Sequence, residues 1–382
     1  MDKKRRGKVK KYMNVLFVMF LFSTTFLVFF GGEKMKSLSV EELDIYTGVG
    51  LGINKYGEAD TKYRIPAILN AYKLDGSVER VISTGVGSTI GKTRQDRDNK
   101  IGHKLFFGLA KLYLIEEEYA RFGIRTLMDV TFKNPAINNN LYVVVCKGRS
   151  EEYFRRDIPG YDNSADYISD MIKNSVNYNF FKADNYMFKN LVLSMDAEGK
   201  NVVSPYIELM EDGIKITGMV VFKRDKLAAI LDMKDTKIMN MLRENKVNGI
   251  LTIQKDSQKY INYESESKRK ITCAKIGDKY TFTIDLDLKG EIINNELYKN
   301  MAAKIEVTEK FEEDMAKQVK EMCTGFLEKM KNRYKLDCLQ LGWVAAAKYG
   351  RDTGVDWDKV VSNSEIKVNV KVHVDKIGRG QY

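Results

Sequence analysis

An uncharged apolar segment near the N-terminus constrains this chain more than any other feature. Residues 12–30 contain no charged side chain and only four polar ones, and they follow a basic stretch, residues 1–11, with seven Lys or Arg and one Asp. As a helix rising ~1.5 Å per residue the segment would be about 28 Å long, close to the roughly 30 Å hydrocarbon core of a bilayer. The basic flank would stay in the cytoplasm, so everything after the segment would be exported.

The residues that follow the apolar segment decide whether it is cleaved, lipidated or retained. Signal peptidase requires small residues one and three positions before the cut. A cut after Gly31 or Gly32 would place Phe29 or Phe30 at the third position, and both are too large. No lipidation site is found, because the first cysteine is Cys146 and none lies near Gly31 and Gly32. The sequence therefore favours an uncleaved signal anchor over a cleaved signal peptide.

The net charge does not indicate a nucleic-acid-binding protein. Of the total of +11, a charge of +6 lies in residues 1–11, which leaves +5 for the other 371 residues. The sequence has no basic stripe interleaved with aromatic residues and no helix-turn-helix or RNA-binding signature. We therefore expect a mildly basic, solvated surface and no nucleic acid among the partners.

Two segments come close to known ligand-binding motifs but depart from them at a decisive position. Residues 83–93 end in Gly91-Lys92-Thr93, as a phosphate-binding loop does, but Val86 stands where the first glycine is required. Residues 285–296 match a calcium loop at several positions, but Lys289 replaces an oxygen ligand. We expect a glycine-rich turn leading into a helix at the first segment and a strand with a turn at the second. No cofactor is predicted.

Histidine and cysteine are too few to predict a catalytic or metal site. Of the two histidines, His103 is expected near the start of an amphipathic helix and His373 on the exposed face of a strand. The four cysteines are expected to be small buried side chains, with a Cys323–Cys338 disulfide as an open alternative. Paired carboxylates could still meet in three dimensions. No catalytic, cofactor-binding or metal-binding residue is predicted.

The apolar pattern predicts a mixed α/β fold in two regions. For the first, residues 37–205, it predicts strands at 63–72, 78–83 and 141–148, and a helix over 101–135 that is broken at Gly123. For the second, residues 213–382, it predicts a hairpin turning at 223–226, a meander of strands up to residue 288, a long helix from about 312 to 334, and a closing strand at 365–377.

Seven segments, in the same order and with matching spacing, carry a family resemblance. They are VEELDIYTGVGLGI, GSTIGKT, HKLFFGLAKLYLIEEEYARFGIRTLMD, NPAINNNLYVVVCKG, GMVVFKRDKLAAILD, a long helix ending KNRYKLDCLQLG, and VNVKVHVDKIGRG after Trp357. Together they resemble the Ger(x)C family, the C subunits of nutrient-germinant receptors of spore-forming Firmicutes. The chain departs from the family where Gly31-Gly32-Glu33 replaces a lipobox cysteine, and where FKNPAI replaces an Arg-Asp-Pro-like stretch.

The resemblance implies a three-domain α/β fold of unusual topology and no catalytic residues. It implies a receptor component in the spore inner membrane, with its body on the outer face, that works with multi-spanning A and B subunits in nutrient-triggered germination. Two other functions stay open. A membrane-anchored extracytoplasmic hydrolase would need a deep cleft with converging acids, and a tethered small-molecule-binding protein would need a closed pocket.

Overall fold

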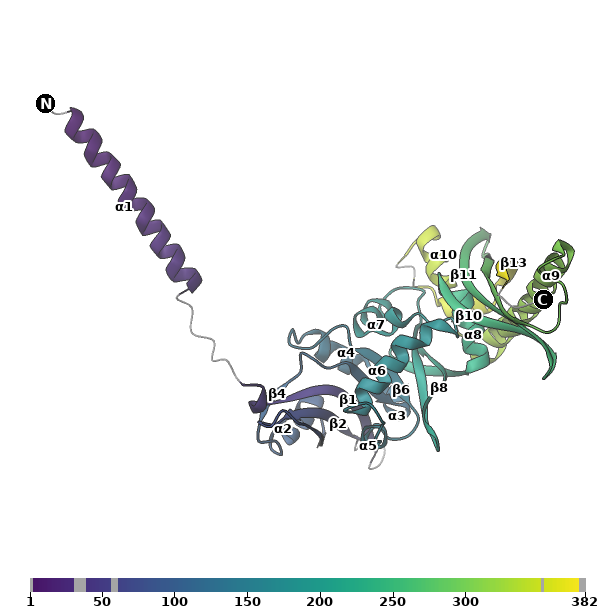
Figure 1. Cartoon of the computed structure of the whole chain (residues 1–382), viewed down its shortest axis with the longest axis horizontal. Helices are drawn as coiled ribbons and strands as arrows, with labels where there is room; N and C mark the ends of the chain where they lie inside the picture. Colours follow the sequence, from purple (N-terminus) through teal and green to yellow (C-terminus); the bar gives the residue numbers. More distant parts are fainter. Residues whose placement is uncertain (1–2, 31–38, 56–60, 352–353, 378–382) are drawn as a thin grey trace. The chain divides into compact units, whose positions relative to one another are not determined.

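The computed structural model describes residues 3–30, 39–55, 61–351 and 354–377, and the chain divides into two compact units, Met1–Glu42 and Leu43–Tyr382 (Figure 1). In the first unit, the helix α1 (Lys3–Phe30) includes the predicted apolar segment. Within the described residues, no helix is both long and apolar enough to cross a membrane. Gly31 and Gly32, where no lipidation site was predicted, lie outside the described residues.

The second unit begins with a nine-stranded mixed sheet in the order β3-β2-β1-β5-β6-β7-β8-β9, with β4 paired to β1. The central strands β1, β5, β6 and β7 pair in parallel, as does β4 with β1, whereas β2, β3, β8 and β9 pair antiparallel. The strands are β1 (Leu43–Lys55), β2 (Thr61–Tyr72), β3 (Val78–Gly87), β4 (Lys104–Phe106), β5 (Leu112–Glu116), β6 (Tyr142–Cys146), β7 (Val202–Met210), β8 (Gly213–Lys223) and β9 (Lys226–Asp232).

Helices cover both faces of this sheet, which explains its continuous apolar central strands. Alternate residues of β5 enter two separate core clusters. Leu112 and Leu114 belong to one cluster, and Tyr113 and Ile115 belong to the other. One face is covered by α5 (Ser150–Arg155) and α6 (Ser164–Asn174), and the other by α3 (Glu117–Phe122), α4 (Arg125–Phe132) and α7 (Phe188–Met195). The helix α2 (Ile90–Asp98) follows β3.

The predicted helix over residues 101–135 is wrong in its first half. The segment forms β4 and β5 before α3, so the prediction is confirmed only for the helix at Glu117–Phe122, the break at Gly123 and the short helix after it. The leucines there have helical spacing, but Leu112–Ile115 is also an unbroken apolar run, and such a run fits a strand that is buried on both faces. His103 therefore lies in a bend, with Nδ1 3.1 Å from Asp44 Oδ1.

A second, four-stranded sheet has the order β10-β11-β12-β13. Its strands are β10 (Val247–Asp256), β11 (Lys259–Ile276), β12 (Lys279–Asn295) and β13 (Glu365–Ile377), and the bounds predicted for the closing strand are confirmed. The helices of this part are α8 (Met233–Arg243), α9 (Ile305–Lys329), α10 (Leu341–Tyr349) and α11 (Trp357–Ser362). Short turns complete the chain at Val40–Glu42, Ser175–Asn177, Ala183–Tyr186 and, as a π-helical turn, Met330–Tyr334.

The long helix and the calcium-like segment differ from prediction in detail. The helix α9 begins at Ile305 rather than near residue 312, and its predicted apolar stripe is core, since Met315, Val319, Cys323 and Phe326 are buried. The turn predicted within residues 285–296 is wrong, because β12 continues through it. Gly290 permits this continuation: a Cβ there would collide with the carbonyl of Glu264 on β11.

The two sheets share one core. A single cluster of buried residues contains Val144 of β6 and Phe282 of β12. The first sheet continues through β9, past residue 213, where the second region was predicted to begin. The division into 37–205 and 213–382, and the three-domain architecture, remain predictions.

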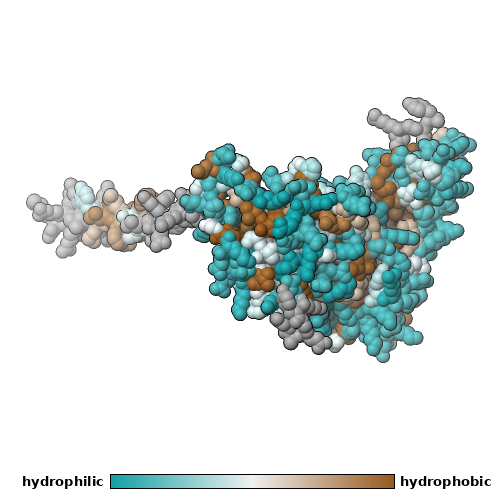
Figure 2. All heavy atoms as spheres, turned by 90° about the horizontal axis from the view of Figure 1, so that it is seen from below, coloured by the Kyte–Doolittle hydropathy of each residue, from teal (hydrophilic) through white to brown (hydrophobic). Residues whose placement is uncertain are grey.

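All four cysteines are buried and unbridged, so the Cys323–Cys338 disulfide is not formed. In Figure 2, hydrophilic side chains cover most of the face shown, with smaller apolar areas between them, an arrangement typical of a protein surface in contact with water.

Candidate functional site

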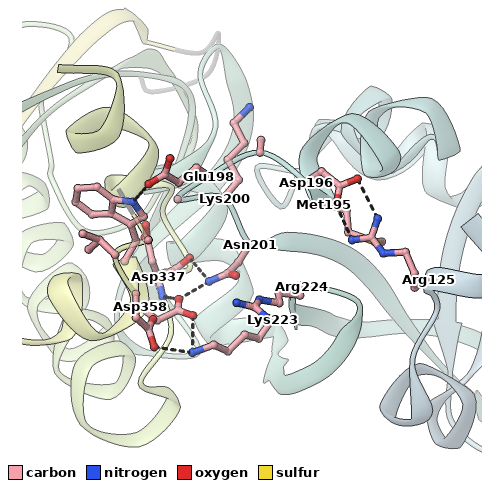
Figure 3. Close-up of a pocket in the computed structure, with 16 residues that line it drawn as sticks. Arg125, Met195, Asp196, Glu198, Lys200, Asn201, Lys223, Arg224, Asp337 and Asp358 are labelled. Atoms are coloured by element: carbon pink, nitrogen blue, oxygen red, sulfur yellow. Dashed lines mark hydrogen bonds and ion pairs between the residues drawn. The ribbon is translucent and has the colours of Figure 1, made fainter. Parts of the chain in front are cut away.

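A polar pocket of about 470 Å³ lies where segments distant in the sequence meet (Figure 3). Its walls come from the start of α4, the loop before β7, the β8–β9 turn and the C-terminal segment around α10 and α11. Gly199, at a φ of +72°, allows the loop before β7 to lie against the start of α10, because a Cβ there would overlap the backbone of Gly342 and Trp343.

Polar side chains, four of them buried, join these segments in what we call the Asn201 cluster: the buried Asn201, Arg243, Asp337 and Asp358, and the partly exposed Lys223. Asn201 Nδ2 donates to Asp358 Oδ1 at 2.5 Å and to the Asp337 carbonyl at 3.3 Å. The same Asp358 oxygen accepts the Asp337 backbone N–H at 2.8 Å, and Lys223 Nζ lies 3.0 Å from Asp358 Oδ2. Arg243 donates to the carbonyls of Asn201 and Cys338. The cluster therefore ties β7, β8 and α8 to the C-terminal segment.

The carboxylate of Asp337 organises the turn that leads into α10. Oδ1 accepts the backbone N–H of Leu339 at 3.0 Å, and Oδ2 accepts that of Gly342 at 2.7 Å. Burial raises the pKa of Asp337 to about 6, although these backbone N–H groups oppose the rise, and the nearby Asp358 adds to it. Asp337 thus acts as an internal cap for buried donors that would otherwise be unpaired.

A hydrolase would require converging acids, and Asp337 and Asp358 are two carboxylic acids that meet at this pocket. Their hydrogen bonds show whether their oxygens are free to act on a substrate. A general acid or base must reach the proton that it transfers. Here both oxygens of Asp337 accept backbone N–H groups of its own turn. Both oxygens of Asp358 are also occupied, by Asn201 and the Asp337 N–H on one side and by Lys223 on the other. Every carboxylate oxygen of the pair therefore already has a partner within the protein.

Three of the charged side chains in the outer wall of the pocket also have partners within the protein. Arg125 and Asp196 form a two-bond ion pair with contacts of 2.5 and 2.9 Å. Trp357 Nε1 donates to Glu198 Oε1 at 2.8 Å. Figure 3 shows these groups around the pocket, with Lys200 pointing away from Asn201.

The motifs weighed in the sequence occupy structural positions. Gly91-Lys92-Thr93 lies in the first turn of α2, where Thr89 caps the helix by accepting the Lys92 N–H at 3.1 Å, so the predicted turn into a helix is confirmed. Asp285 of β12 accepts a hydrogen bond from Asn369. His373 is on the exposed face of β13, as predicted. In the described ranges, no three His, Cys, Asp or Glu side chains gather closely enough to hold a metal ion.

Sequence reasoning did not identify the Asn201 cluster. Asn201 and Asp358 are separated by 157 positions, so no local pattern connects them. A signal was nevertheless present, because Asp337 lies inside KNRYKLDCLQLG and Asp358 follows Trp357, two of the stretches that carry the family resemblance.

Comparisons with known proteins agree with that resemblance. Residues 36–209 match the family model of the spore germination protein N-terminal domain, and residues 217–378 match that of the spore germination B3/GerAC-like C-terminal domain. The spore germination protein GerQC of Bacillus cereus is 21% identical over 367 residues, which cover 94% of this chain and 98% of the relative. The crystal structure of the GerBC protein aligns with 86% of this chain and 97% of its own, at 15% identity and a TM-score of 0.49. The chain therefore belongs to the Ger(x)C family of spore germination proteins.

Proposed function

We propose that this chain is the non-catalytic C subunit of a nutrient germinant receptor and is needed for nutrient-triggered spore germination. The observation that carries the proposal is the extent of the family match. An N-terminal and a C-terminal spore germination domain follow one another along almost the whole chain. The named germination protein GerQC also aligns over nearly its full length. A protein of this kind would act by contacting other receptor subunits.

The state of the acidic residues supports the non-catalytic part of this proposal. The two buried carboxylates that meet at the polar pocket, Asp337 and Asp358, have their oxygens occupied by hydrogen bonds and an ion pair within the protein. Substituting either residue would therefore loosen the attachment of the C-terminal segment, and we expect no loss of a catalytic step.

We further propose that residues 12–30 of α1 hold the chain in the spore inner membrane, with the body from Leu43 onward on its outer face beside multi-spanning A and B subunits. The uncharged sequence of this segment and the basic residues before it support this orientation. Large apolar side chains of α1 are exposed between Tyr12 and Phe26. Such a surface is stable only when lipid or protein covers it.

Deletion of the gene, with affinity capture, tests the receptor assignment. Spores without the gene should fail to germinate with nutrient, and a tagged full-length copy should restore germination. Capture of that copy from detergent-solubilised spore membranes should bring down both multi-spanning subunits. Normal germination of the deletion strain, in a background without other nutrient receptors, would contradict the proposal.

A paired substitution in α1 tests the anchor separately. Lysine at the centre of a spanning helix costs about 2.5–3.5 kcal/mol. Val18→Lys should therefore release the protein from membranes on fractionation, whereas the matched variant Ser23→Ala should remain bound. Equal membrane retention of the two variants would mean that residues 12–30 do not anchor the chain.

A further inference from the structure

A second pocket, of about 330 Å³, has an unusual balance of charge. We call it the basic pocket; it lies between the segment before β7, the end of α8 and the middle of β11, and its lining includes Lys182, Lys200, Arg243, Glu244, Asn245 and Arg269. Four of these six side chains are cations and one is an anion.

One cation and the anion neutralise each other. Arg243 Nε lies 3.1 Å from Glu244 Oε1, and both side chains are buried. The other nitrogens of Arg243 donate to two backbone carbonyls, and the second oxygen of Glu244 accepts Asn185 Nδ2 at 2.6 Å. Each oxygen of Glu244 therefore already has a hydrogen-bond partner, and neither partner is one of the other three cations.

The other three cations have no carboxylate partner within the described residues. The guanidinium of Arg269 makes no hydrogen bond or ion pair there, and its Nε is buried without an acceptor. The backbone N–H of Arg269 donates to Asn245 Oδ1. Lys200 Nζ lies 4.3 Å from the centre of the Trp343 ring, and it points away from Asn201 (Figure 3). Lys182 donates through its backbone alone. The pocket therefore carries three uncompensated positive charges.

Holding these charges together without an anion is unfavourable. Burial lowers the pKa of Arg269 to about 10, with Glu244 partly offsetting the effect and Arg243 adding to it. Burial also lowers the pKa of Lys200, and Arg243 lowers it further. Cations lose hydration in such a site, and the Trp343 ring beside Lys200 and the charge of Glu244 replace only part of that loss. An anion that enters the pocket would restore more of the lost interaction energy.

We propose that the basic pocket binds a small oxyanion with at least two negative charges, in which a carboxylate or phosphate group contacts Arg269 and lies between Lys182 and Lys200. A guanidinium presents two parallel N–H donors that match the oxygens of either group. The volume is at the lower end of the range for small-molecule pockets. Because the cations come from the segment before β7 and from β11, a bound anion would join segments that belong to different sheets.

Calorimetric titration of the full-length chain in uncharged detergent tests this proposal. Inorganic pyrophosphate and citrate should bind with one site per chain, whereas chloride at the same ionic strength should not. Arg269→Gln and Lys200→Met should each weaken binding about tenfold or more. Lys255→Met, which removes an exposed cation of β10 outside the pocket, should leave the affinity unchanged.

Thermal unfolding and displacement by lipid test the proposal further. Without anion, Arg269→Gln should unfold at the same temperature as the unmodified chain or a higher one, because it removes an unpaired buried charge. A lower unfolding temperature would mean that Arg269 is structural. Absence of binding at millimolar oxyanion, or equal binding by Arg269→Gln, would overturn the assignment. If anionic phospholipid added to the micelles displaces pyrophosphate, the bound group is a lipid headgroup; if it does not, it is a free oxyanion.

Discussion

Replacing Asp358 by alanine or by asparagine separates the two kinds of interaction that this side chain makes. Its Oδ1 accepts both Asn201 Nδ2 and the Asp337 N–H, whereas its Oδ2 meets only Lys223. Alanine removes all three contacts. Asparagine can keep its amide oxygen toward the two buried donors and give up only the ion pair, because the reverse orientation would set its NH₂ against them.

The expected free energies follow from burial. In Asp358→Ala the Asp337 N–H has no acceptor and Asn201 keeps only its longer bond, and each unpaired buried donor costs about 1–3 kcal/mol. The Lys223 side chain is 44% exposed, so loss of its ion pair adds about 1 kcal/mol at most. We therefore expect Asp358→Ala to lower the free energy of unfolding by about 3–5 kcal/mol, and Asp358→Asn by about 1 kcal/mol or less.

Denaturant unfolding of the detergent-solubilised chain, followed by tryptophan fluorescence, measures this difference. The two tryptophans of the chain, Trp343 and Trp357, both lie in the segment that Asp358 fastens. Equal losses in the two variants would show that the ion pair, and not the buried hydrogen bonds, carries the stability. A loss below about 1 kcal/mol in Asp358→Ala would refute the reasoning altogether.

Three other predictions use the same unfolding assay or a simple chemical probe. Gly52→Ala should lower the free energy of unfolding by about 2 kcal/mol or more, because its Cβ would overlap the buried carboxylate of Glu116. Gly325→Ala, whose Cβ meets open space within α9, should raise the free energy of unfolding by about 0.5–1 kcal/mol. An unchanged stability of Gly52→Ala would contradict this reasoning. Since the pKa of Asp337 rises on folding from 3.8 to about 6, folding binds an extra proton between these values. The stability of the unmodified chain relative to Asp337→Asn should therefore fall by about 2–3 kcal/mol as the pH rises from about 4 to about 7, and a constant difference would count against the raised pKa. The four cysteines, all buried and unbridged, should resist a thiol reagent in the folded chain and all react once it is unfolded without reductant; fewer than four reactive thiols would reveal a disulfide.

Local patterns predicted the secondary structure well where one face of an element is buried. The alternation in residues 365–377 gave the bounds of β13, and the stripe on α9 gave its buried face, because both periodicities arise from a single core contact. The same reasoning failed for residues 112–115, where both faces are buried and no period remains to distinguish a strand from a helix.

Neither pocket could be predicted in this way. The two hydrogen bonds that Asn201 donates from its side chain join residues more than a hundred positions apart, and the basic pocket draws its cations from three separate segments. In the sequence these are ordinary Asn, Asp, Lys and Arg residues within a chain of 30% charged side chains.

The sequence by itself determined the apolar segment and its basic flank, most strands and helices, and membership of a germination family. Those properties depend on the order of neighbouring residues. Only the tertiary structure decided that Asp337 and Asp358 hold the C-terminal segment in place and that the guanidinium of Arg269 has no ion-pair partner among the described residues. The physical reason is that the energy of a charge depends on its burial and on neighbours within a few ångströms through space, and folding alone chooses those neighbours.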